Sequence, residues 1–372
     1  MAVHIKNLNI ESFRGIRGLA LDNLNHVNII AGDNNSGKTS VLEALMLLRS
    51  PMDFQTTLRV ARARDKGYPF NNASLYENFL NLFPRNVDEF EISINGICWG
   101  KPVIIRLFGN QEIILITPEE LHQNSDSATR RVRIKNYPSE IEASAFKGKF
   151  YCQLDKESFE EHIEIHAYSK MSSRTLGPLG HPDFIYLSPF EHIRGNVFSK
   201  VLRDNQYKEI CINILQLFDQ KISDLLYLKD EITGRPIEYI RHETLGNMPL
   251  STYGDGIKKV LSLANGIAQA ANGVLMIDEL ETAIHAKYYN DIFRFMAKAC
   301  KQFQVQLFIT THSMEAIDKL LTTQEYDNQG EADDITVITF KKEFNSAQTL
   351  SRTLSGRRVY SNREEFGFEV RL

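Results

Sequence analysis

The sequence predicts an α/β fold in which a mixed sheet is flanked by helices. Three short apolar runs carry this prediction, at residues 27–31, 273–277 and 306–310. Runs of this length suit strands that are buried on both faces, and the first leads through a glycine-rich loop into helical spacing. A long stretch separates the first run from the second, so we expect an insertion that is first β-rich and then helical.

The composition is that of an ordinary globular protein. Of the 372 residues, 42% are hydrophobic and 24% are charged, which excludes disordered, collagen-like and disulfide-scaffold classes. The length suits two or three domains. The 43 basic and 47 acidic residues give a net charge of −4, so nucleic-acid binding would need a local basic patch rather than bulk charge.

The cysteines and the apolar runs indicate the compartment. No two cysteines form a Cys-x-x-Cys pair, as is usual in a reducing environment; they are Cys98, Cys152, Cys211 and Cys300. The first residues lack the apolar core of a signal peptide. No apolar run reaches the roughly 18 residues that a membrane span needs, so we expect a cytoplasmic protein with no membrane partner.

A phosphate-binding motif lies near the start of the chain. Residues 3–10 alternate between apolar and polar side chains, which predicts a strand. The run at 27–31 ends a second strand, residues 32–39 read GDNNSGKT, and residues 40–49 form an amphipathic helix that stops before Pro51. Strand, glycine-rich loop and helix are the context that the phosphate-binding loop GxxxxGK[ST] requires.

This loop predicts ATP and Mg²⁺ as ligands. Its glycines let the backbone wrap around a phosphate so that amides point at it, and the helix N-terminus adds a positive dipole end. Lys38 would neutralise β- and γ-phosphate oxygens, and the Thr39 hydroxyl would bind Mg²⁺. The expected nucleotide-binding residues of the loop are Gly32, Asn34, Asn35, Ser36, Gly37, Lys38, Thr39 and Ser40.

Basic residues after this helix have two interpretations. Arg59, Arg62 and Lys66 would share one helical face, with Arg64 beside it. They could face a phosphate or form solvated surface, and we favour the second because short charge runs are common. Two further groups could contact nucleic-acid phosphates or be solvated surface: Arg130, Arg131, Arg133 and Lys135, and Arg352, Arg357, Arg358 and Arg363.

The middle of the chain alternates rather than showing helical periodicity. We expect a β-rich insertion over residues 75–183, with turn breaks at 95–96 and 109–110. Its strands are predicted at residues 89–98, 103–107, 113–117, 131–135 and 161–166.

A strand and a helical arm are expected next, over residues 184–235. Residues 184–187 read as a buried strand, and residues 190–230 read as helical. The arm carries an apolar stripe between residues 212 and 226, which suits packing or a dimer seam better than a ligand site.

The two later apolar runs each deliver polar residues at their ends. The run at 273–277 is followed by Asp278 and Glu279, which is the Walker B arrangement. Asp278 would hold the Mg²⁺ shell, and Glu279 would orient or deprotonate the attacking water. The run at 306–310 leads to His312, a candidate sensor of the γ-phosphate, because a neutral imidazole can donate a hydrogen bond to that oxygen.

A glycine turn precedes both of these strands. Gly254 and Gly256 open a long amphipathic helix that begins with Lys258 and Lys259. The turn is either a plain helix cap or a second helix N-terminus that meets a phosphate across a dimer interface.

These motifs, in this order, resemble the ABC-type ATPase heads of the SMC, RecF and OLD (overcoming lysogenization defect) group. In particular they resemble compact AAA-family ATPases of the ATP/GTP phosphatase-like kind. Residues 10–15, IESFRG, resemble the opening motif of the group, and residues 278–285, DELETAIH, resemble its segment after Walker B. The resemblance implies a P-loop NTPase fold with an ABC-type head, made of an N-terminal lobe at 1–74 and a C-terminal lobe at 236–372.

The resemblance also implies that the protein works as a homodimer or higher homo-oligomer. Two heads would enclose two ATP molecules, each bound by the phosphate loop of one chain and by Gly254 and Gly256 of the other. Arg14 would reach the nucleotide, and His285 would lie near the dimer seam. Glu279, His312 and Lys38 are the expected catalytic residues of this Mg²⁺-dependent ATPase.

For the biological role, the resemblance implies that ATP-driven dimerisation gates a nucleic-acid-directed activity or a partner effector nuclease in anti-phage defence. OLD-type proteins carry a Toprim nuclease with an Asp-x-Asp metal site. Asp333 and Asp334 do not match that pattern, so we expect no intrinsic nuclease and an effector in trans. The alternative is an ATP-bound scaffold or sensor that hydrolyses slowly and holds a partner protein on the β-rich insertion.

Overall fold

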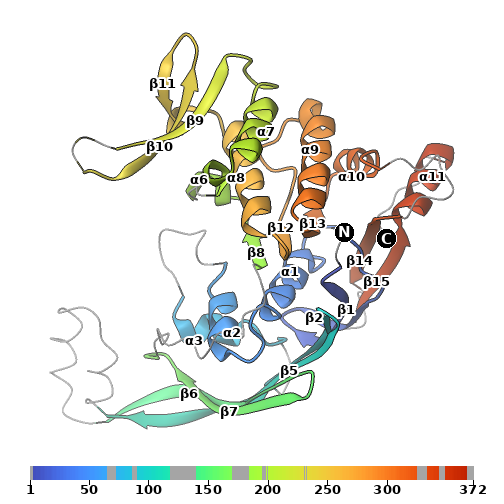
Figure 1. Ribbon diagram of the computed structural model, residues 1–372. Coiled ribbons are helices and arrows are strands. Elements are labelled where there is room, and N and C mark those ends of the chain that lie inside the picture. Colours follow the sequence, from blue (N-terminus) through green and yellow to red (C-terminus); the bar gives the residue numbers. More distant parts are fainter. Residues whose placement is uncertain are drawn as a thin grey trace.

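The computed structural model (Figure 1) describes residues 3–64, 73–85, 90–117, 140–169, 184–194, 198, 200–229, 231, 233–324, 333–342 and 348–366. Within these residues the strands form two six-stranded sheets and one three-stranded sheet. No helix in this part of the chain combines the length and the apolarity that crossing a membrane requires. The four cysteines are buried and form no disulfide.

The central sheet is mixed, as the sequence predicts. Its strand order is β15-β14-β3-β13-β12-β8, and neighbours pair in parallel except β15, which is antiparallel to β14. The three predicted apolar runs are the adjacent strands β3, β13 and β12, so their carboxyl ends lie side by side. The strands are β3 (Val27–Gly32), β8 (Phe184–Leu187), β12 (Val274–Ile277), β13 (Gln306–Thr311), β14 (Ile335–Lys342) and β15 (Thr349–Ser355).

Helices cover both faces of this sheet because successive side chains of a strand point to opposite faces. Ile29 and Ile309 lie in one core with the helices α8, α9 and α10, whereas Ile30 and Phe308 lie in a second core with α1. These helices are α1 (Lys38–Leu47), α8 (Asp255–Gln269), α9 (Tyr289–Gln302) and α10 (Met314–Leu321), and α11 (Gly356–Phe366) lies beside β14.

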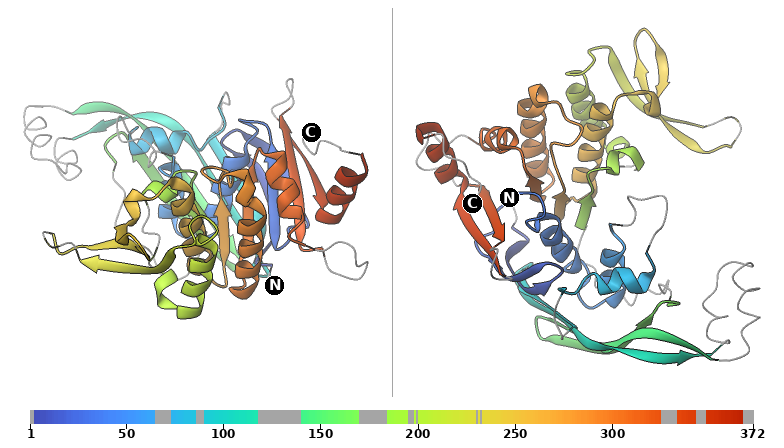
Figure 2. Two further views of the ribbon diagram at one scale, coloured as in Figure 1. Left: turned by 90° about the horizontal axis from the view of Figure 1, so that it is seen from above. Right: turned by 180° about the vertical axis from the view of Figure 1, so that it is seen from behind.

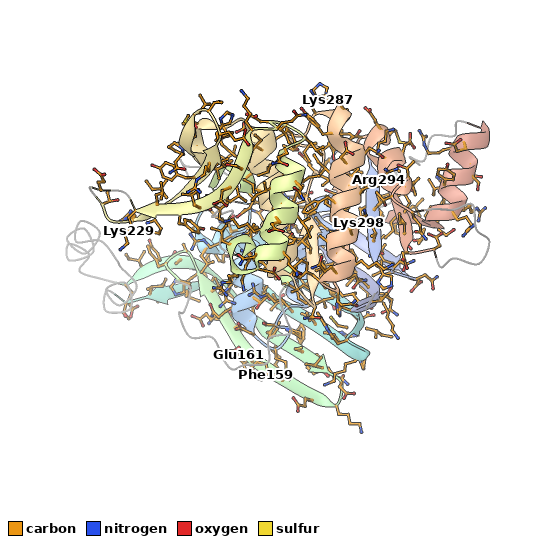
Figure 3. All side chains as sticks on the ribbon, turned by 45° about the horizontal axis from the view of Figure 1, so that its top comes forward. Phe159, Glu161, Lys229, Lys287, Arg294 and Lys298 are labelled. Atoms are coloured by element: carbon orange, nitrogen blue, oxygen red, sulfur yellow. The ribbon has the colours of Figure 1, made fainter. Side chains whose placement is uncertain are left out.

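Helix α9 illustrates how the pattern of side chains sets burial. Ile292, Phe293 and Met296 are buried against the central sheet. Arg294 and Lys298 lie one turn apart on the outer face, where both are exposed (Figure 3). Apolar residues at helical spacing therefore fix which side of α9 faces the core.

The second large sheet is antiparallel, in the order β2-β1-β4-β5-β6-β7. Helices α2 and α3 lie against one face of it (Figure 2), where the rings of Phe79 and Phe146 are 5.1 Å apart. The elements are β1 (Ile5–Phe13), β2 (Ile16–Leu21), α2 (Phe54–Ala61), α3 (Leu75–Leu80), β4 (Phe90–Cys98), β5 (Lys101–Ile116), β6 (Ile141–Leu154) and β7 (Glu157–His166). Because β1 pairs with β4, this sheet is continuous across residue 74.

The turn breaks expected at residues 95–96 and 109–110 are wrong, because β4 and β5 run straight through them. A Cβ on Gly96 would lie 2.6 Å from the Asn7 carbonyl oxygen, and one on Gly109 would lie 2.3 Å from that of Lys147. These glycines therefore mark a close approach of neighbouring strands rather than turns. The strand expected at 131–135 falls outside the described residues.

The helical interpretation of residues 190–230 is correct only for its middle. Helix α7 (Asn205–Leu215) ends before the stripe does, and Ile222 and Leu225 lie on strand β9 (Ile222–Lys229). A bulge in the pairing of β9 with β10 lets both side chains be buried although they are three residues apart. Short elements complete this region: α6 (Glu191–Arg194), β10 (Pro236–His242), β11 (Gly246–Pro249) and the 3-10 turns Val201–Arg203, Leu250–Thr252 and Ala286–Tyr288.

Candidate active site

The glycine-rich loop between β3 and α1 adopts the backbone that a phosphate cradle needs. Gly32, Asn35 and Gly37 all have positive φ angles, of 152°, 63° and 107°. A Cβ on Gly32 would lie 3.0 Å from the Ser36 hydroxyl and 3.1 Å from the Phe340 carbonyl oxygen. The loop therefore turns tightly at the carboxyl end of β3, with the first turn of α1 behind it.

The polar groups of this loop fit a phosphate. The Lys38 ammonium donates to the carbonyl oxygens of Gly32 and Asp33, both at 2.8 Å, so it lies over the loop. The Ser36 hydroxyl is buried and makes no hydrogen bond to the described residues, and a phosphate oxygen would satisfy it. Burial lowers the pKa of Lys38, and the carboxylates of Asp278 and Glu279 oppose that shift.

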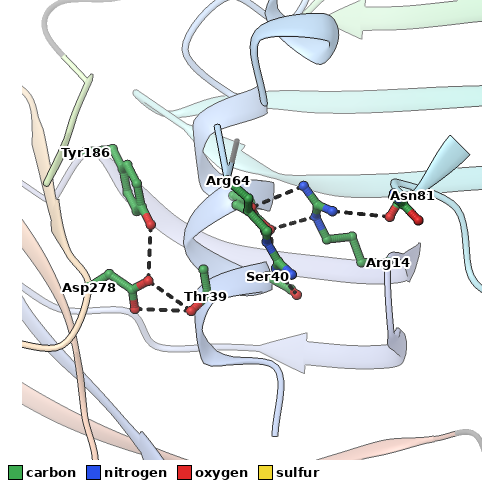
Figure 4. A network of polar contacts seen from close by, with 8 residues as sticks. Arg14, Thr39, Ser40, Arg64, Asn81, Tyr186 and Asp278 are labelled. Carbon is green, nitrogen blue, oxygen red and sulfur yellow. Dashed lines mark hydrogen bonds and ion pairs between the residues drawn. The ribbon is translucent and has the colours of Figure 1, made fainter. Parts of the chain in front are cut away.

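Asp278 joins the two halves of the site (Figure 4). Its carboxylate accepts hydrogen bonds from Thr39 Oγ1 at 2.9 and 3.2 Å, from Thr310 Oγ1 at 2.5 Å and from the Tyr186 hydroxyl at 3.1 Å. These donors come from α1, β13 and β8, which converge at one edge of the central sheet. Burial, and then the charge of Asp278, raises the pKa of Tyr186 well above its usual value, so that hydroxyl stays a donor.

Thr39 and Asp278 could hold Mg²⁺ together with phosphate oxygens and water. Among the described residues no group of three or more His, Cys, Asp and Glu side chains is placed to bind a metal ion. Mg²⁺ does not need such a cage, because it usually keeps several waters and takes one or two protein oxygens plus substrate phosphates. The hydroxyl and the carboxylate fit that donor set.

Glu279 follows Asp278 in a strained conformation. Its φ angle is 49°, in the left-handed region that side chains other than glycine avoid. Its backbone N–H donates to Thr310 Oγ1 at 2.8 Å, and the Thr282 hydroxyl donates to its carboxylate at 3.3 Å. Thr310 thus fixes both acids, and strain of this kind is concentrated at functional sites.

His312 is held by a second glutamate. Its backbone N–H and its ring Nδ1 both lie 2.9 Å from Glu281 Oε1, and about half of its side chain is exposed. If Nδ1 carries the hydrogen that Glu281 accepts, Nε2 of a neutral ring is left as an acceptor, and Nε2 could donate to a γ-phosphate oxygen only in a ring with both nitrogens protonated.

A buried ionic cluster supports α1 from behind (Figure 4). The carboxylate of Glu43, 3% exposed, lies 2.7 Å from Arg14 Nε and 2.7 Å from Arg64 Nη2. Arg64 also donates to the Ser40 hydroxyl at 3.1 Å, so this arginine is paired on one side although 49% of its side chain is exposed. Arg14 also donates a hydrogen bond to the carbonyl oxygen of Asn81, at 3.2 Å. Its contacts with Glu43 and Asn81 together hold the Arg14 side chain beside α1.

The glycine turn of α8 is close to the segment that follows Walker B. Gly254 caps α8 and is exposed, and a Cβ on Gly256 would lie 3.3 Å from the Ala283 carbonyl oxygen. The exposed His285 accepts a hydrogen bond from the Lys287 N–H at 3.2 Å and so caps the next turn.

Several contributors could not be identified from the sequence. From the sequence, Tyr186 would be interpreted as a core residue of a buried strand. Glu43 would be interpreted as an ordinary polar residue of an amphipathic helix. Glu281 lies within the DELETAIH segment and Thr310 ends the apolar run before His312, but nothing in the sequence assigns either residue a role of its own. Of the basic groups, Arg363 is bonded to Asp318, and residues 130–135 lie outside the described part.

The chain is similar in sequence or in fold to several known proteins. Residues 27–318 match the family described as "AAA domain, putative AbiEii toxin, Type IV TA system". A Helicobacter pylori protein named "ATP/GTP phosphatase" is 22% identical over 85% of this chain and 87% of its own length. The "DNA replication and repair protein RecF" of Shewanella woodyi is 24% identical over 86% of this chain and 93% of its own.

Further similar proteins include an archaeal sequence and a solved structure. The "Uncharacterized protein MJECL10" of Methanocaldococcus jannaschii is 29% identical over 50% of this chain and 80% of its own length. An SMC head, solved with the C-winged helix domain of ScpA, aligns with a TM-score of 0.51 at 11% identity, covering 96% of this chain and all of that one. At that identity the likeness concerns the fold.

Proposed function

The chain belongs to this AAA-domain family, within the ABC-type ATPases of the RecF and SMC-like group, and from that membership we propose that it is a Mg²⁺-dependent ATP hydrolase. The contact of Thr39 with Asp278, at 2.9 Å, is the observation that carries the proposal. It brings a hydroxyl at the start of α1 and a carboxylate at the end of β12 together, and both are groups that would hold Mg²⁺.

Each residue has a role that follows from its chemistry. Lys38 and the amides of the loop bind the β- and γ-phosphates of ATP, and Thr39 and Asp278 hold the cation. Bound Mg²⁺ supplies positive charge to the phosphate oxygens as the γ-phosphoryl group leaves. Glu279, fixed by Thr310, orients the attacking water and accepts its proton.

Phosphate release in steady state tests this proposal. Asp278→Asn should lower the rate by about 100-fold or more, because the cation loses its anionic ligand. Asp291→Asn, at an exposed position on α9, is the matched control and should leave the rate unchanged. A wild-type protein without Mg²⁺-dependent phosphate release, or an Asp278→Asn variant as active as wild type, would overturn it.

The finer part of the proposal is that ATP brings two heads together. The exposed Gly254 leaves amides at the start of α8 open to a second molecule. Blocked hydrolysis should trap that dimer, so Glu279→Gln should double its mass in light scattering when ATP and Mg²⁺ are added. A variant that stays monomeric at saturating ATP would count against enclosure of ATP between heads.

Dimerisation would then gate a nucleic-acid-directed activity or an effector nuclease in trans, as in anti-phage defence. The competing function is a slowly hydrolysing scaffold that holds a partner protein. Exposed apolar side chains on β5 favour that alternative, since Ile113 is 73% and Leu115 59% exposed.

Recovery of the Glu279→Gln protein from its native cells with ATP and Mg²⁺ separates action through a protein partner from direct action on nucleic acid. A protein partner that survives nuclease treatment supports the effector or the scaffold, and loss of that partner from an Ile113→Ser variant assigns it to β5. Recovery of nucleic acid alone supports direct action on the polymer.

A further inference from the structure

Asp278 is held on both sides by hydroxyl groups from neighbouring strands. Strand β12, which ends just before Asp278, lies between β8 and β13 in the central sheet. Tyr186, on β8, donates to Oδ2 of the carboxylate at 3.1 Å (Figure 4). Thr310, on β13, donates to Oδ1 at 2.5 Å. Each carboxylate oxygen therefore has its own donor, and the two donors come from opposite sides of β12.

The third donor to this carboxylate, Thr39, cannot fix it in the same way. Its Oγ1 lies 2.9 Å from Oδ2 and 3.2 Å from Oδ1, but a threonine hydroxyl has only one hydrogen to donate. The same hydroxyl is the group that would bind Mg²⁺. The orientation of the carboxylate therefore depends on Tyr186 and Thr310.

Tyr186 is itself held in place by its strand and by packing. The Asp278 backbone N–H donates to the carbonyl oxygen of Leu187, the residue after Tyr186, at 3.0 Å. The Tyr186 ring packs against the core that contains α1, and a tyrosine side chain has only two χ angles. The main chain and the carboxylate of Asp278 are thus both tied to β8, which leaves the Tyr186 hydroxyl little freedom to move away from Oδ2.

We propose that Tyr186 is a positioning residue that sets the affinity of the site for Mg²⁺, because its hydroxyl holds the carboxylate of Asp278 in one orientation. The proposal rests on the ATPase function proposed above, in which Asp278 serves the cation. Groups that hydrogen-bond to a metal-binding carboxylate orient it, and losing one typically costs about 10- to 100-fold in metal affinity. Lys38 and the loop amides would bind the phosphates without help from Tyr186, so nucleotide binding in the absence of a cation should not depend on it.

Tyr186→Phe tests the proposal, because it removes the hydroxyl and keeps the ring. The probe is Mn²⁺, titrated into protein that is saturated with a non-hydrolysable ATP analogue and followed by electron paramagnetic resonance. We expect the Kd for Mn²⁺ to rise by about 10-fold or more. Binding of the analogue in the presence of EDTA should stay within about twofold of wild type, because the orienting contact serves only the cation. Unchanged Mn²⁺ affinity, or an equal loss of analogue binding in EDTA, would overturn the proposal.

A second tyrosine provides the matched control. Tyr207, on α7, is fully buried, and its hydroxyl donates to the Ala264 carbonyl oxygen of α8 at 2.6 Å. Tyr186→Phe and Tyr207→Phe each lose one hydrogen bond that is shielded from water, so both should melt at a lower temperature than wild type. Only Tyr186→Phe should bind Mn²⁺ more weakly. A similar loss of Mn²⁺ affinity in Tyr207→Phe would assign the effect to reduced stability and overturn the proposal.

A double variant tests whether Tyr186 acts through Asp278. In the Asp278→Asn background the carboxylate that Tyr186 holds is gone, so adding Tyr186→Phe should weaken Mn²⁺ binding no further. Additive losses would show that the two residues act independently and would also overturn the proposal.

Phosphate release separates this inference from the ATPase function. A change confined to cation binding should be overcome by more cation, so Tyr186→Phe should reach a turnover number within about threefold of wild type at saturating Mg²⁺. Mn²⁺ binding that weakens in Tyr186→Phe supports the inference even if wild type releases no phosphate, a result that would refute the ATPase function alone. An active wild type with unchanged Mn²⁺ affinity in Tyr186→Phe would refute the inference alone.

Discussion

Replacing Glu43 by glutamine should destabilise the protein strongly. The carboxylate of Glu43 is 3% exposed and neutralises Arg14, which is itself 8% exposed, as well as Arg64. In Glu43→Gln, Arg14 would be left as a buried charge without its counter-ion. Breaking a buried ion pair from one side costs about 3–5 kcal/mol, and Arg64 adds little to this because half of its side chain already reaches water.

Urea denaturation, followed by circular dichroism, measures this loss as a change in the free energy of unfolding. The matched control is Glu160→Gln, which removes the same charge from a 2.8 Å ion pair with Lys149 on the exposed face of the sheet. That variant should unfold like wild type, because exposed pairs contribute little.

A second substitution tests the reason for the loss. Arg14→Met in the Glu43→Gln background removes the stranded charge, so it should restore part of the lost stability. A loss below about 1 kcal/mol for Glu43→Gln, or no recovery in the double variant, would refute the reasoning.

Two further predictions concern buried groups. Because burial lowers the pKa of folded Lys259 from 10.5 to about 8, the unfolded chain keeps this proton to higher pH. Between about pH 8 and pH 10.5, the free energy of unfolding of wild type should therefore rise by about 3 kcal/mol relative to that of Lys259→Met. A difference that is flat in pH, measured by urea titrations at several pH values, would contradict this burial. Burial also raises the pKa of all four cysteine thiols to about 12. A thiol reagent such as dithionitrobenzoate should label none of them in the native protein and all of them in denaturant; fast labelling of the native protein would show that a thiol is accessible.

The parts of the site that the sequence predicts are those encoded by neighbouring residues. The phosphate loop is a continuous stretch in which the glycines, Lys38 and Thr39 have fixed spacing. The pattern of apolar residues on either side predicts the strand before the loop and the helix after it. Asp278 and His312 stand at the ends of apolar runs, and parallel strands place such ends at one edge of a sheet. The same runs predict the adjacent strands β3, β13 and β12, whereas the antiparallel edge strand β15 lies outside them.

The parts that the sequence does not predict depend on contacts between distant segments. Tyr186 reaches Asp278 only because β8 pairs with β12, and Arg64 reaches Glu43 only because α2 turns back along α1. Gly96 and Gly109 look like turn residues until the neighbouring strands are known to approach them. Ile222 and Leu225 keep a helical spacing in the sequence, but the pairing of β9 with β10 decides their structure.

The most direct test of the account is a single-turnover measurement on Glu279→Gln, with Mg²⁺-ATP limiting and the enzyme in excess. The account predicts that the variant binds ATP as tightly as wild type and hydrolyses it about 100-fold or more slowly, because general base catalysis is lost. Glu315→Gln, at an exposed acid on α10, should hydrolyse at the wild-type rate. Hydrolysis by Glu279→Gln at the wild-type rate would contradict the assignment of the site.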